Sequence, residues 1–410
     1  MENTSRDHDL VLYGATGFVG ELIAGHLAEH APAGLRIGLA GRSREKLGAV
    51  RSRLPAAARE WSLIEADSED AGSLAALAAS TRVLFTTVGP YAKYGLPVVE
   101  ACARAGTHYG DLTGEVSFVR EAIDRYDAVA RSTGARLVHS CGYDSVPSDL
   151  AVLLLHQAAE ADGAGGLTDV QLVATARGGI SGGTLESMLG QLDGMCSSDT
   201  LRALAADPYS LSPDRAREPT TTQPADVAPV SRSEDGRWTA PFIMASANTR
   251  IVRRSNALQG WAYGRSLRYG EVMGVARGPA GAVIAGATAL GLGVFVKATA
   301  LAPLRRVLDR VLPAPGTGPS EDRRRSGWFR SEATASTEDG RRYRAVAAGP
   351  GDPGYAATAV MAGETALALA LDGDRLPPAN GSLTPATALG DVLVQRLRAA
   401  GHTYDVTRIG

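Results

Sequence analysis

Three glycines near the start of the chain stand at intervals of three, directly after a short apolar run. Gly14, Gly17 and Gly20 follow residues 10–13, and apolar residues recur at helical spacing from residue 18 onward. This order predicts a strand, a tight turn and a helix. In such a unit the first glycine allows the turn, the second lets the backbone approach a pyrophosphate, and the third lets the helix pack against the strand. Because a helix N-terminus also binds phosphates, we expect a dinucleotide site here rather than an ordinary turn.

Two arginines follow the second apolar run, at the position that selects between dinucleotides. Residues 35–41 are predicted to form a strand, and Arg42, Ser43 and Arg44 come directly after it. Cofactors without a 2′-phosphate usually meet an Asp or Glu here, which binds the ribose hydroxyls. That carboxylate is missing, and a guanidinium can hold a phosphate through two parallel N–H bonds. The position therefore favours NADP, the alternative being that both arginines are solvated loop charges.

Two further strand ends complete the predicted cofactor site. Asp67 ends the strand predicted from Trp61 and could accept a bond from the adenine amino group; its alternative role is the N-cap of the next helix. The strand from Arg82 ends in a turn-rich loop, over which we expect the nicotinamide, because ligands bind at the carboxyl ends of parallel strands. The predicted cofactor contacts are Gly14, Ala15, Thr16, Gly17, Phe18, Val19, Gly20, Arg42, Ser43, Arg44, Asp67, Val88, Gly89, Pro90 and Tyr91.

Hydride transfer also needs a proton donor, and no familiar spacing identifies it. Short-chain reductases carry Tyr and Lys four residues apart, but none of the three lysines here has a tyrosine four residues before it. We favour Tyr143, because a phenol can donate to an enolate oxygen or α-carbon at neutral pH. A structural role is the alternative for every candidate. The candidates at strand ends are Tyr91, Asp111, Cys141, Tyr143 and Asp144.

Alternating strands and helices over the first 150 residues predict a parallel, doubly wound sheet. The pattern changes after about residue 160, where a mixed sheet with helices is expected to carry the substrate pocket. Glu338, Asp339 and Gly340 are typical of a hairpin turn, and residues 207–237 are predicted to be an irregular loop. The strands expected in this half are 169–176, 242–247, 262–269, 329–337 and 341–347, and the helices begin near residues 182 and 351.

Composition excludes several classes of protein. The chain has 410 residues, enough for two or three domains, with a net charge of −2 that gives no reason to expect nucleic-acid binding. Cys102, Cys141 and Cys196 show no paired spacing, which indicates a reducing compartment and no metal site. The first nine residues are polar and lack a signal-like apolar region. These features together predict a cytoplasmic protein.

Residues 278–296 differ from an ordinary enzyme sequence. The stretch holds no charge, and Thr288 is its one polar side chain. A helix of this length would be about 28 Å long, close to the hydrocarbon thickness of a bilayer. Residues 301–312 then place apolar side chains on one helical face and arginines away from it. We expect residues 278–312 to lie on a membrane surface rather than to span it, because enzyme sequence flanks both ends; a buried helical hairpin or a dimer interface is the alternative.

Seven motifs together resemble a known family. They are Gly14-Ala-Thr-Gly-Phe-Val-Gly20, Ala40-Gly-Arg-Ser43, Val88-Gly-Pro-Tyr91, His108-Tyr-Gly-Asp-Leu-Thr-Gly-Glu115, Cys141-Gly-Tyr-Asp-Ser-Val-Pro-Ser-Asp149, Gly351-Asp-Pro-Gly-Tyr355 and Leu383-Thr-Pro-Ala386. The chain resembles the saccharopine dehydrogenase-like oxidoreductases, and within them the bacterial trans-acting enoyl reductases, which serve polyketide synthases that make cell-envelope lipids. The resemblance implies an NADP-binding Rossmann domain at 1–150, an inserted α/β substrate domain at 151–350, and C-terminal helices at 351–410 that return to the first domain.

The motifs and the resemblance together imply an NADPH-dependent oxidoreductase. Its expected substrate is an unsaturated acyl thioester in lipid, glycolipid or polyketide biosynthesis, carried by a polyketide synthase. One alternative is a saccharopine-type reductase that acts on the imine of an amino acid and a keto acid. Another is a lipid-surface protein that binds NADP without turnover. Relatives linked to membranes and lipid bodies imply a peripheral position on the inner face of the plasma membrane, with a homodimer as the alternative use of the apolar segment.

Overall fold

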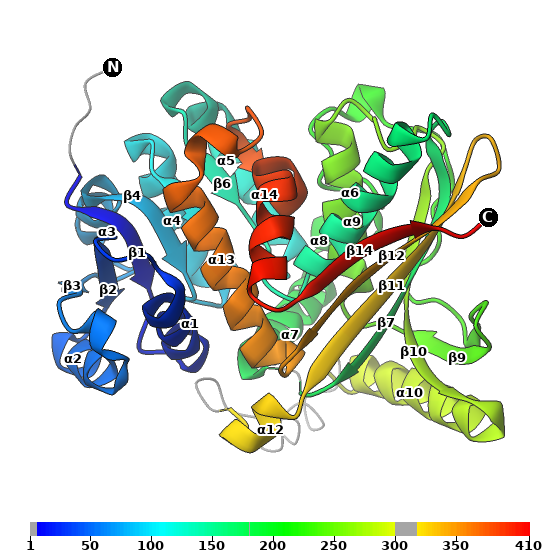
Figure 1. Cartoon of the computed structure of the whole chain (residues 1–410), viewed down its shortest axis with the longest axis horizontal. Helices are drawn as coiled ribbons and strands as arrows, with labels where there is room; N and C mark the ends of the chain where they lie inside the picture. The colour runs from blue at the N-terminus through cyan, green and yellow to red at the C-terminus, as the bar shows by residue number, and fades with distance from the viewer. Residues whose placement is uncertain (1–5, 180, 300–317) are drawn as a thin grey trace.

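Two sheets form the framework of the protein. The computed structural model describes residues 6–179, 181–299 and 318–410. Within these residues each sheet has seven strands, and the two sheets lie side by side with helices packed around them (Figure 1). Most strands of the first sheet come from the N-terminal part of the chain, and the second sheet is built from the residues that follow.

The first sheet is parallel throughout, in the order β13-β6-β5-β4-β1-β2-β3. Because successive side chains of a strand point to opposite faces, Leu10 and Leu12 of β1 join the core that contains α1, while Val11 and Tyr13 join the core that contains α3 and α4. Burial on both faces explains the continuous apolar run, and the predicted doubly wound parallel sheet is confirmed. The strands are β1 (His8–Tyr13), β2 (Ile37–Gly41), β3 (Ser62–Glu65), β4 (Thr81–Thr86), β5 (His108–Gly110), β6 (Arg136–Val138) and β13 (Gly381–Leu383).

The strand order of this sheet reverses at β1, which pairs with β2 on one side and β4 on the other. The loops after β1 and β4 therefore border a crevice at the carboxyl edge of the sheet, where open α/β sheets bind ligands. The helices of this half are α1 (Phe18–His30), α2 (Arg44–Arg53), α3 (Ala71–Ser80), α4 (Tyr91–Ala105), α5 (Val116–Thr133), α13 (Thr358–Leu371) and α14 (Pro385–Ala399).

The second sheet is mixed, as predicted, in the order β14-β12-β11-β7-β10-β9-β8. β7 and β10 are parallel, and the other neighbours are antiparallel. The predicted hairpin is confirmed as β11 and β12, and α6 and α9 pack against the sheet. The strands are β7 (Leu167–Arg177), β8 (Ser231–Arg232), β9 (Arg237–Pro241), β10 (Arg268–Arg277), β11 (Trp328–Thr337), β12 (Arg342–Pro350) and β14 (Thr403–Arg408), and the helices are α6 (Val146–Ala161), α7 (Gly182–Ser197), α8 (Asp199–Ala206), α9 (Ala245–Leu258), α10 (Gly278–Thr299) and α12 (Glu321–Arg325).

Two strand predictions in this half are wrong. The run at 242–247 is not a strand, because β9 ends at Pro241 and α9 begins at Ala245. Ile243 and Met244 line a pocket instead. The strand predicted at 262–269 begins only at Arg268. The first residues of this stretch form a turn in which Tyr263 and Leu267 are buried. The spacing of these apolar residues therefore reflects their burial and not an extended backbone. The strands β13 and β14 were not predicted in the C-terminal stretch.

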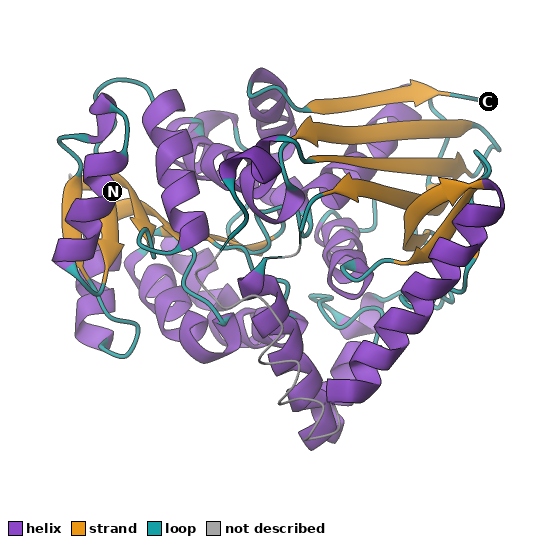
Figure 2. Cartoon of the chain, turned by 90° about the horizontal axis from the view of Figure 1, so that it is seen from below, coloured by secondary structure: helices purple, strands orange, loops and turns teal. Residues whose placement is uncertain are grey.

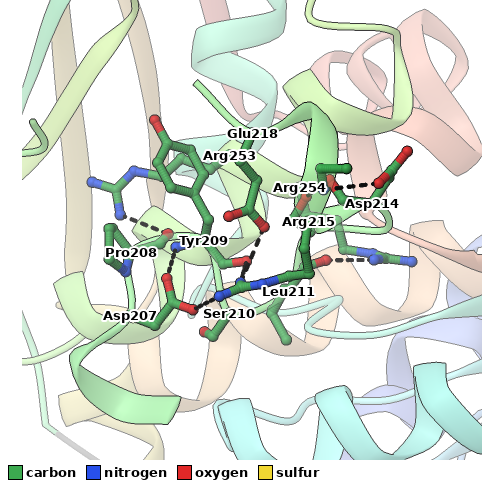
Figure 3. A network of polar contacts seen from close by, with 12 residues as sticks. Asp207, Pro208, Tyr209, Ser210, Leu211, Asp214, Arg215, Glu218, Arg253 and Arg254 are labelled. Atoms are coloured by element: carbon green, nitrogen blue, oxygen red, sulfur yellow. Dashed lines mark hydrogen bonds and ion pairs between the residues drawn. The ribbon is translucent and has the colours of Figure 1, made fainter. Parts of the chain in front are cut away.

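The predicted irregular loop is held in place by arginines of α9 (Figure 3). Arg253 donates to the carbonyl of Pro208 at 3.2 Å, and Arg254 donates to the carbonyl of Leu211 at 2.6 Å. The second Nη of Arg254 donates to the carbonyl of Ser382 at 2.5 Å. Burial lowers the pKa of Arg254 to about 9. Arg254 thus joins the loop after α8 to β13 of the first sheet, which positions α9 between the two halves.

The apolar stretch forms α10, most of which is uncovered by protein. Its first turns pack on β9 and β10, and the helix then leaves the sheet (Figures 1 and 2). Over 278–295 its mean hydropathy is 1.6 with only 11% buried, whereas the other long apolar stretch, 353–371, is 78% buried. Packing in the core therefore explains the apolar composition of 353–371 but not that of α10. The helix predicted at 301–312, with Arg305, Arg306 and Arg310, lies outside the described residues.

Candidate functional site

The turn after β1 has the geometry that a pyrophosphate needs. Gly14 has φ of +88°, and a Cβ there would lie 2.6 Å from Oγ1 of Thr87. A Cβ on Gly20 would lie 2.3 Å from the carbonyl oxygen of Gly14. Gly17 is the N-cap of α1 and supplies no side chain to its N-terminus. The first N–H groups of α1 are therefore open to a ligand, and the turn fits the diphosphate of a dinucleotide.

A pocket of about 260 Å³ begins at this turn and extends between the two halves of the protein. Residues 17–20 of the glycine turn, together with Thr87 and Gly89 after β4, form its floor. The first half of α7 forms one wall, and Ile243 and Met244 form another. The pocket thus places a dinucleotide site beside an apolar space supplied by the second half.

The residues after β2 leave one arginine free for a phosphate. Arg42 is exposed and has no side-chain bond to another described residue. Ser43 caps α2 by accepting from the N–H of Lys46 at 3.3 Å. Arg44 donates to the carbonyl of Leu63 at 2.8 Å, so its guanidinium is already engaged. The contact of either arginine with a 2′-phosphate stays a prediction, and Arg42 is the one whose guanidinium makes no bond to another described residue.

Asp67 lies two residues after the end of β3, at the edge where a contact to adenine is expected. Its Oδ1 accepts from the N–H of Glu69 at 3.1 Å. The alternative role of Asp67, as N-cap of the following helix, is wrong: the N-cap of α3 is Asp70, which accepts from the N–H of Gly72 at 2.9 Å. The adenine contact of Asp67 stays a prediction.

Among the predicted proton donors, Tyr91 and Cys141 are engaged in the core. The ring of Tyr91 borders the pocket, but its hydroxyl donates to the carbonyl of Thr86 at 3.2 Å and accepts from the N–H of Leu112 at 3.1 Å. Cys141 is fully buried, and its thiol donates to the carbonyl of Val138. Burial raises the pKa of both groups well above their usual values. Neither offers a free proton to the pocket.

The favoured Tyr143 and its neighbour Asp144 point into different surroundings. Tyr143 does not border the pocket: its ring packs edge-on against Phe329 of β11 at 5.4 Å, and burial raises its pKa. Asp144 does border the pocket. Burial, and then the nearby carboxylate of Asp111, raise the pKa of Asp144 to about 7. Tyr143 is therefore not brought into the site, and Asp144 is.

Asp111 is itself a structural anchor rather than a donor. It is completely buried and accepts four hydrogen bonds. Its Oδ2 accepts from Tyr109 at 2.9 Å and from Nδ1 of His139 at 2.7 Å, and its Oδ1 accepts from the N–H groups of Thr113 and Ser140. Because all four bonds tie Asp111 to neighbouring segments of the first half, its carboxyl group holds β5, β6 and the loops after them together.

Several residues of the site were not predicted. The walls include Ser187, Met188 and Gln191 of α7, and Glu115 lies behind them. In the sequence, Glu115 is the last residue of a motif that carries the family resemblance, and nothing local indicates its role. Ile243 and Met244 fall in a stretch that the sequence predicts to be a strand, because an apolar run gives the same signal whether it faces a core or a pocket.

Comparison with known proteins agrees with this geometry. The family model for the saccharopine dehydrogenase NADP binding domain matches residues 10–138. The trans-acting enoyl reductases of Mycobacterium ulcerans and Mycobacterium bovis are each 45% identical to this chain, over 421 and 423 residues, and cover 100% of both chains. A Mycobacterium tuberculosis relative is 50% identical over 420 residues, again with 100% of both chains covered. The chain belongs to the saccharopine dehydrogenase-like oxidoreductases, among the trans-acting enoyl reductases.

The fold agrees with this family. The apo saccharopine dehydrogenase (L-Glu forming) of Saccharomyces cerevisiae superposes with a TM-score of 0.56 over 98% of this chain and 99% of that chain, at 12% identity. The protein is therefore an NADP-dependent oxidoreductase. NADPH supplies a hydride, and the chain's own groups at the glycine turn and after β4 would hold and orient it.

Proposed function

We propose that this oxidoreductase reduces the carbon–carbon double bond of an α,β-unsaturated acyl thioester. The observation that carries the proposal is the lining of the pocket. Among the described residues that line it there is no Arg, Lys or His, while Leu112, Met188, Ile243 and Met244 supply apolar surface. The alternative substrate, the imine of an amino acid and a keto acid, bears carboxylates that need a cationic partner when buried. An acyl chain needs none.

Asp144 supplies the proton in this proposal. Addition of hydride to the β-carbon leaves an enolate, which takes a proton at the α-carbon to give the saturated thioester. A carboxyl group with a pKa of about 7 is protonated often enough at neutral pH to act as this general acid. Asp144 replaces Tyr143, whose phenol packs against the second sheet.

A panel of substrates tests the proposal. Purified protein and NADPH are mixed with 2-enoyl thioesters of increasing length, and separately with lysine or glutamate plus a keto acid, and NADPH oxidation is followed by absorbance. We expect turnover with the thioesters that rises with acyl length, because each added CH₂ buried in the apolar space contributes about 0.8 kcal/mol. Saccharopine-type activity without turnover of any enoyl thioester would overturn the proposal.

The name of the relatives suggests how the substrate arrives. A trans-acting enzyme meets its substrate on a separate protein, and the relatives carry this name. For this chain we propose an acyl thioester on a polyketide synthase or similar carrier, in the assembly of a lipid or glycolipid.

A lipid surface is the partner we propose for α10. Val283, Ile284, Leu290 and Val294 are 72%, 47%, 70% and 57% exposed. Fully burying a large apolar side chain contributes about 1.5–3 kcal/mol, so an exposed patch of this kind marks an interaction surface. α10 also contacts α7, the wall of the pocket. Attachment through α10 to the inner face of the plasma membrane would bring the pocket beside its hydrophobic substrate.

Flotation with anionic liposomes tests this attachment. Wild-type protein should float with the vesicles at low salt, and Leu290→Glu combined with Val294→Glu should abolish flotation, because two charges enter the apolar face. Val227→Glu is the matched control, since Val227 is 72% exposed and lies outside α10. Wild-type protein that stays free of vesicles and forms a dimer in sedimentation would assign α10 to a homodimer instead.

A further inference from the structure

Glu115 has no part in the reaction described above, yet its carboxylate is buried beside the pocket. The residue is 2% exposed. Its Oε1 accepts from the N–H of Tyr91 at 2.9 Å, and its Oε2 accepts from the N–H of Ala92 at 2.8 Å. These are the first two residues of α4, whose N-cap, Pro90, provides no side-chain bond. Because the first N–H groups of a helix lack internal partners, Glu115 caps α4 from a distant segment.

The same carboxylate also binds the opposite wall of the pocket. Ser187 of α7 donates its hydroxyl proton to Oε1 of Glu115 at 2.6 Å. Gln191, one turn further along α7, donates to the carbonyl of Gly114 at 3.4 Å. Ser187 and Gln191 both line the pocket. Glu115 therefore connects the turn after β4, on which the nicotinamide is expected, to the helix that covers the substrate space.

The bonds of Glu115 divide into two separable groups. Among the described residues no cation lies within ion-pair distance of this carboxylate, so its three hydrogen-bond donors compensate for its burial. Two of them, on Tyr91 and Ala92, fix the floor of the pocket. The third, on Ser187, fixes only the wall. A change at Ser187 should therefore release α7 and leave the cofactor turn in place.

We propose that Glu115 is a positioning residue for the reduction and that its bond to Ser187 is the latch that holds α7 over the substrate. This inference rests on the proposed enoyl-thioester reduction for its kinetic readout. The latch sets the distance between the cofactor turn and the acyl-binding wall. Its loss therefore affects substrate binding more than cofactor binding.

Kinetics of three variants test the latch. A hydrogen bond to a charged group contributes about 1.5–3 kcal/mol, so Ser187→Ala should raise the KM for an enoyl thioester roughly tenfold or more, with the NADPH Kd within about twofold of wild type. Ser187→Thr keeps the hydroxyl and should restore the wild-type KM. Glu115→Gln disturbs both groups of bonds and should weaken NADPH and substrate binding together. Ser187→Thr behaving like Ser187→Ala would contradict the latch.

Hydrogen exchange tests the same bond without any substrate. Ser187→Ala should speed amide exchange in α7 and leave exchange at the start of α4 unchanged. Ser197→Ala is the matched control, because among the described residues the hydroxyl of Ser197 bonds only to the backbone of α7 itself, at Asp193 and Gly194. If wild-type protein reduces no enoyl thioester, the proposed function fails. The exchange measurement still shows whether the bond between Glu115 and Ser187 holds α7 in place. Unchanged α7 exchange in Ser187→Ala would overturn the inference.

Discussion

Replacing Asp144 by Asn should abolish most of the activity and change its dependence on pH. The pKa of Asp144 is raised to about 7 by burial and by Asp111. A general acid works only when protonated, so the wild-type kcat should fall roughly 100-fold between pH 6 and pH 9, as the protonated fraction falls from about 0.9 to about 0.01. Asp144→Asn carries no acidic proton, and a lost general acid costs about 10²–10⁴ in rate.

The raised pKa of Asp144 also predicts how the variant changes stability. Asp144→Asn should lower the activity but raise the stability of the folded protein at alkaline pH. Because the pKa rises on folding, the folded state binds the proton more tightly, and this stabilisation is present below pH 4 and lost as pH rises through 7. A rise from 3.8 to about 7 corresponds to at most about 4 kcal/mol. The asparagine variant has no charge to bury. Urea unfolding should therefore show it equal to the wild type near pH 4 and more stable than the wild type above pH 8.

Asp149→Asn is the matched control for these measurements. Burial also raises the pKa of Asp149 to about 7, but its carboxylate accepts from Ser255 at 2.5 Å and from the N–H of Ala386 at 2.8 Å, away from the pocket. Near pH 4, where neither protein carries a charge at this position, this variant should lose stability, because its NH₂ group replaces one of the two accepting oxygens. It should keep the alkaline decline of kcat. The reasoning is refuted if Asp144→Asn retains more than a tenth of the wild-type kcat, or if the alkaline decline persists in it.

Three further substitutions separate cofactor selection, proton donation and architecture. Arg42→Asp should weaken NADPH binding more than NADH binding in fluorescence titrations, because a charge-assisted pair becomes a repulsion; equal losses would exclude the assignment. Tyr143→Phe should keep kcat within about threefold, since the phenol lies outside the pocket, and a large loss of kcat would return Tyr143 to the reaction. Arg254→Met should lower the free energy of unfolding by about 2–4 kcal/mol, because two buried carbonyls lose their donor, whereas Arg202→Met on the surface should change it little.

The N-terminal half of the fold could be read from sequence because local chemistry determines it. The glycines after β1 have no room for a side chain, and a buried parallel strand needs an uninterrupted apolar run. The sequence predicts correctly that the second sheet is mixed, but it misplaces two of the strands. Ile243 and Met244 line a pocket, and Tyr263 is buried by a turn. Neither location requires a strand. Periodicity reports burial, and burial has more than one structural cause.

The sequence limits the candidates for the proton donor to a few residues but does not identify the donor. Tyr143 and Asp144 are neighbours in the chain, and only the packing of Tyr143 against Phe329 separates their surroundings. The role of Glu115 depends on Ser187 of α7, which comes 72 residues later in the chain. Contacts between distant segments leave no local pattern, so such residues become visible only in the folded structure.

The central claim is that NADPH reduces an enoyl thioester in this pocket. The most direct measurement is mass spectrometry of the product formed from a long-chain 2-enoyl thioester with NADPH deuterated at the transferable position. The claim predicts a saturated thioester with one deuterium at the β-carbon and solvent hydrogen at the α-carbon, and loss of this product in Asp144→Asn. Recovery of the unchanged enoyl thioester at every chain length, from protein that binds NADPH, would contradict it.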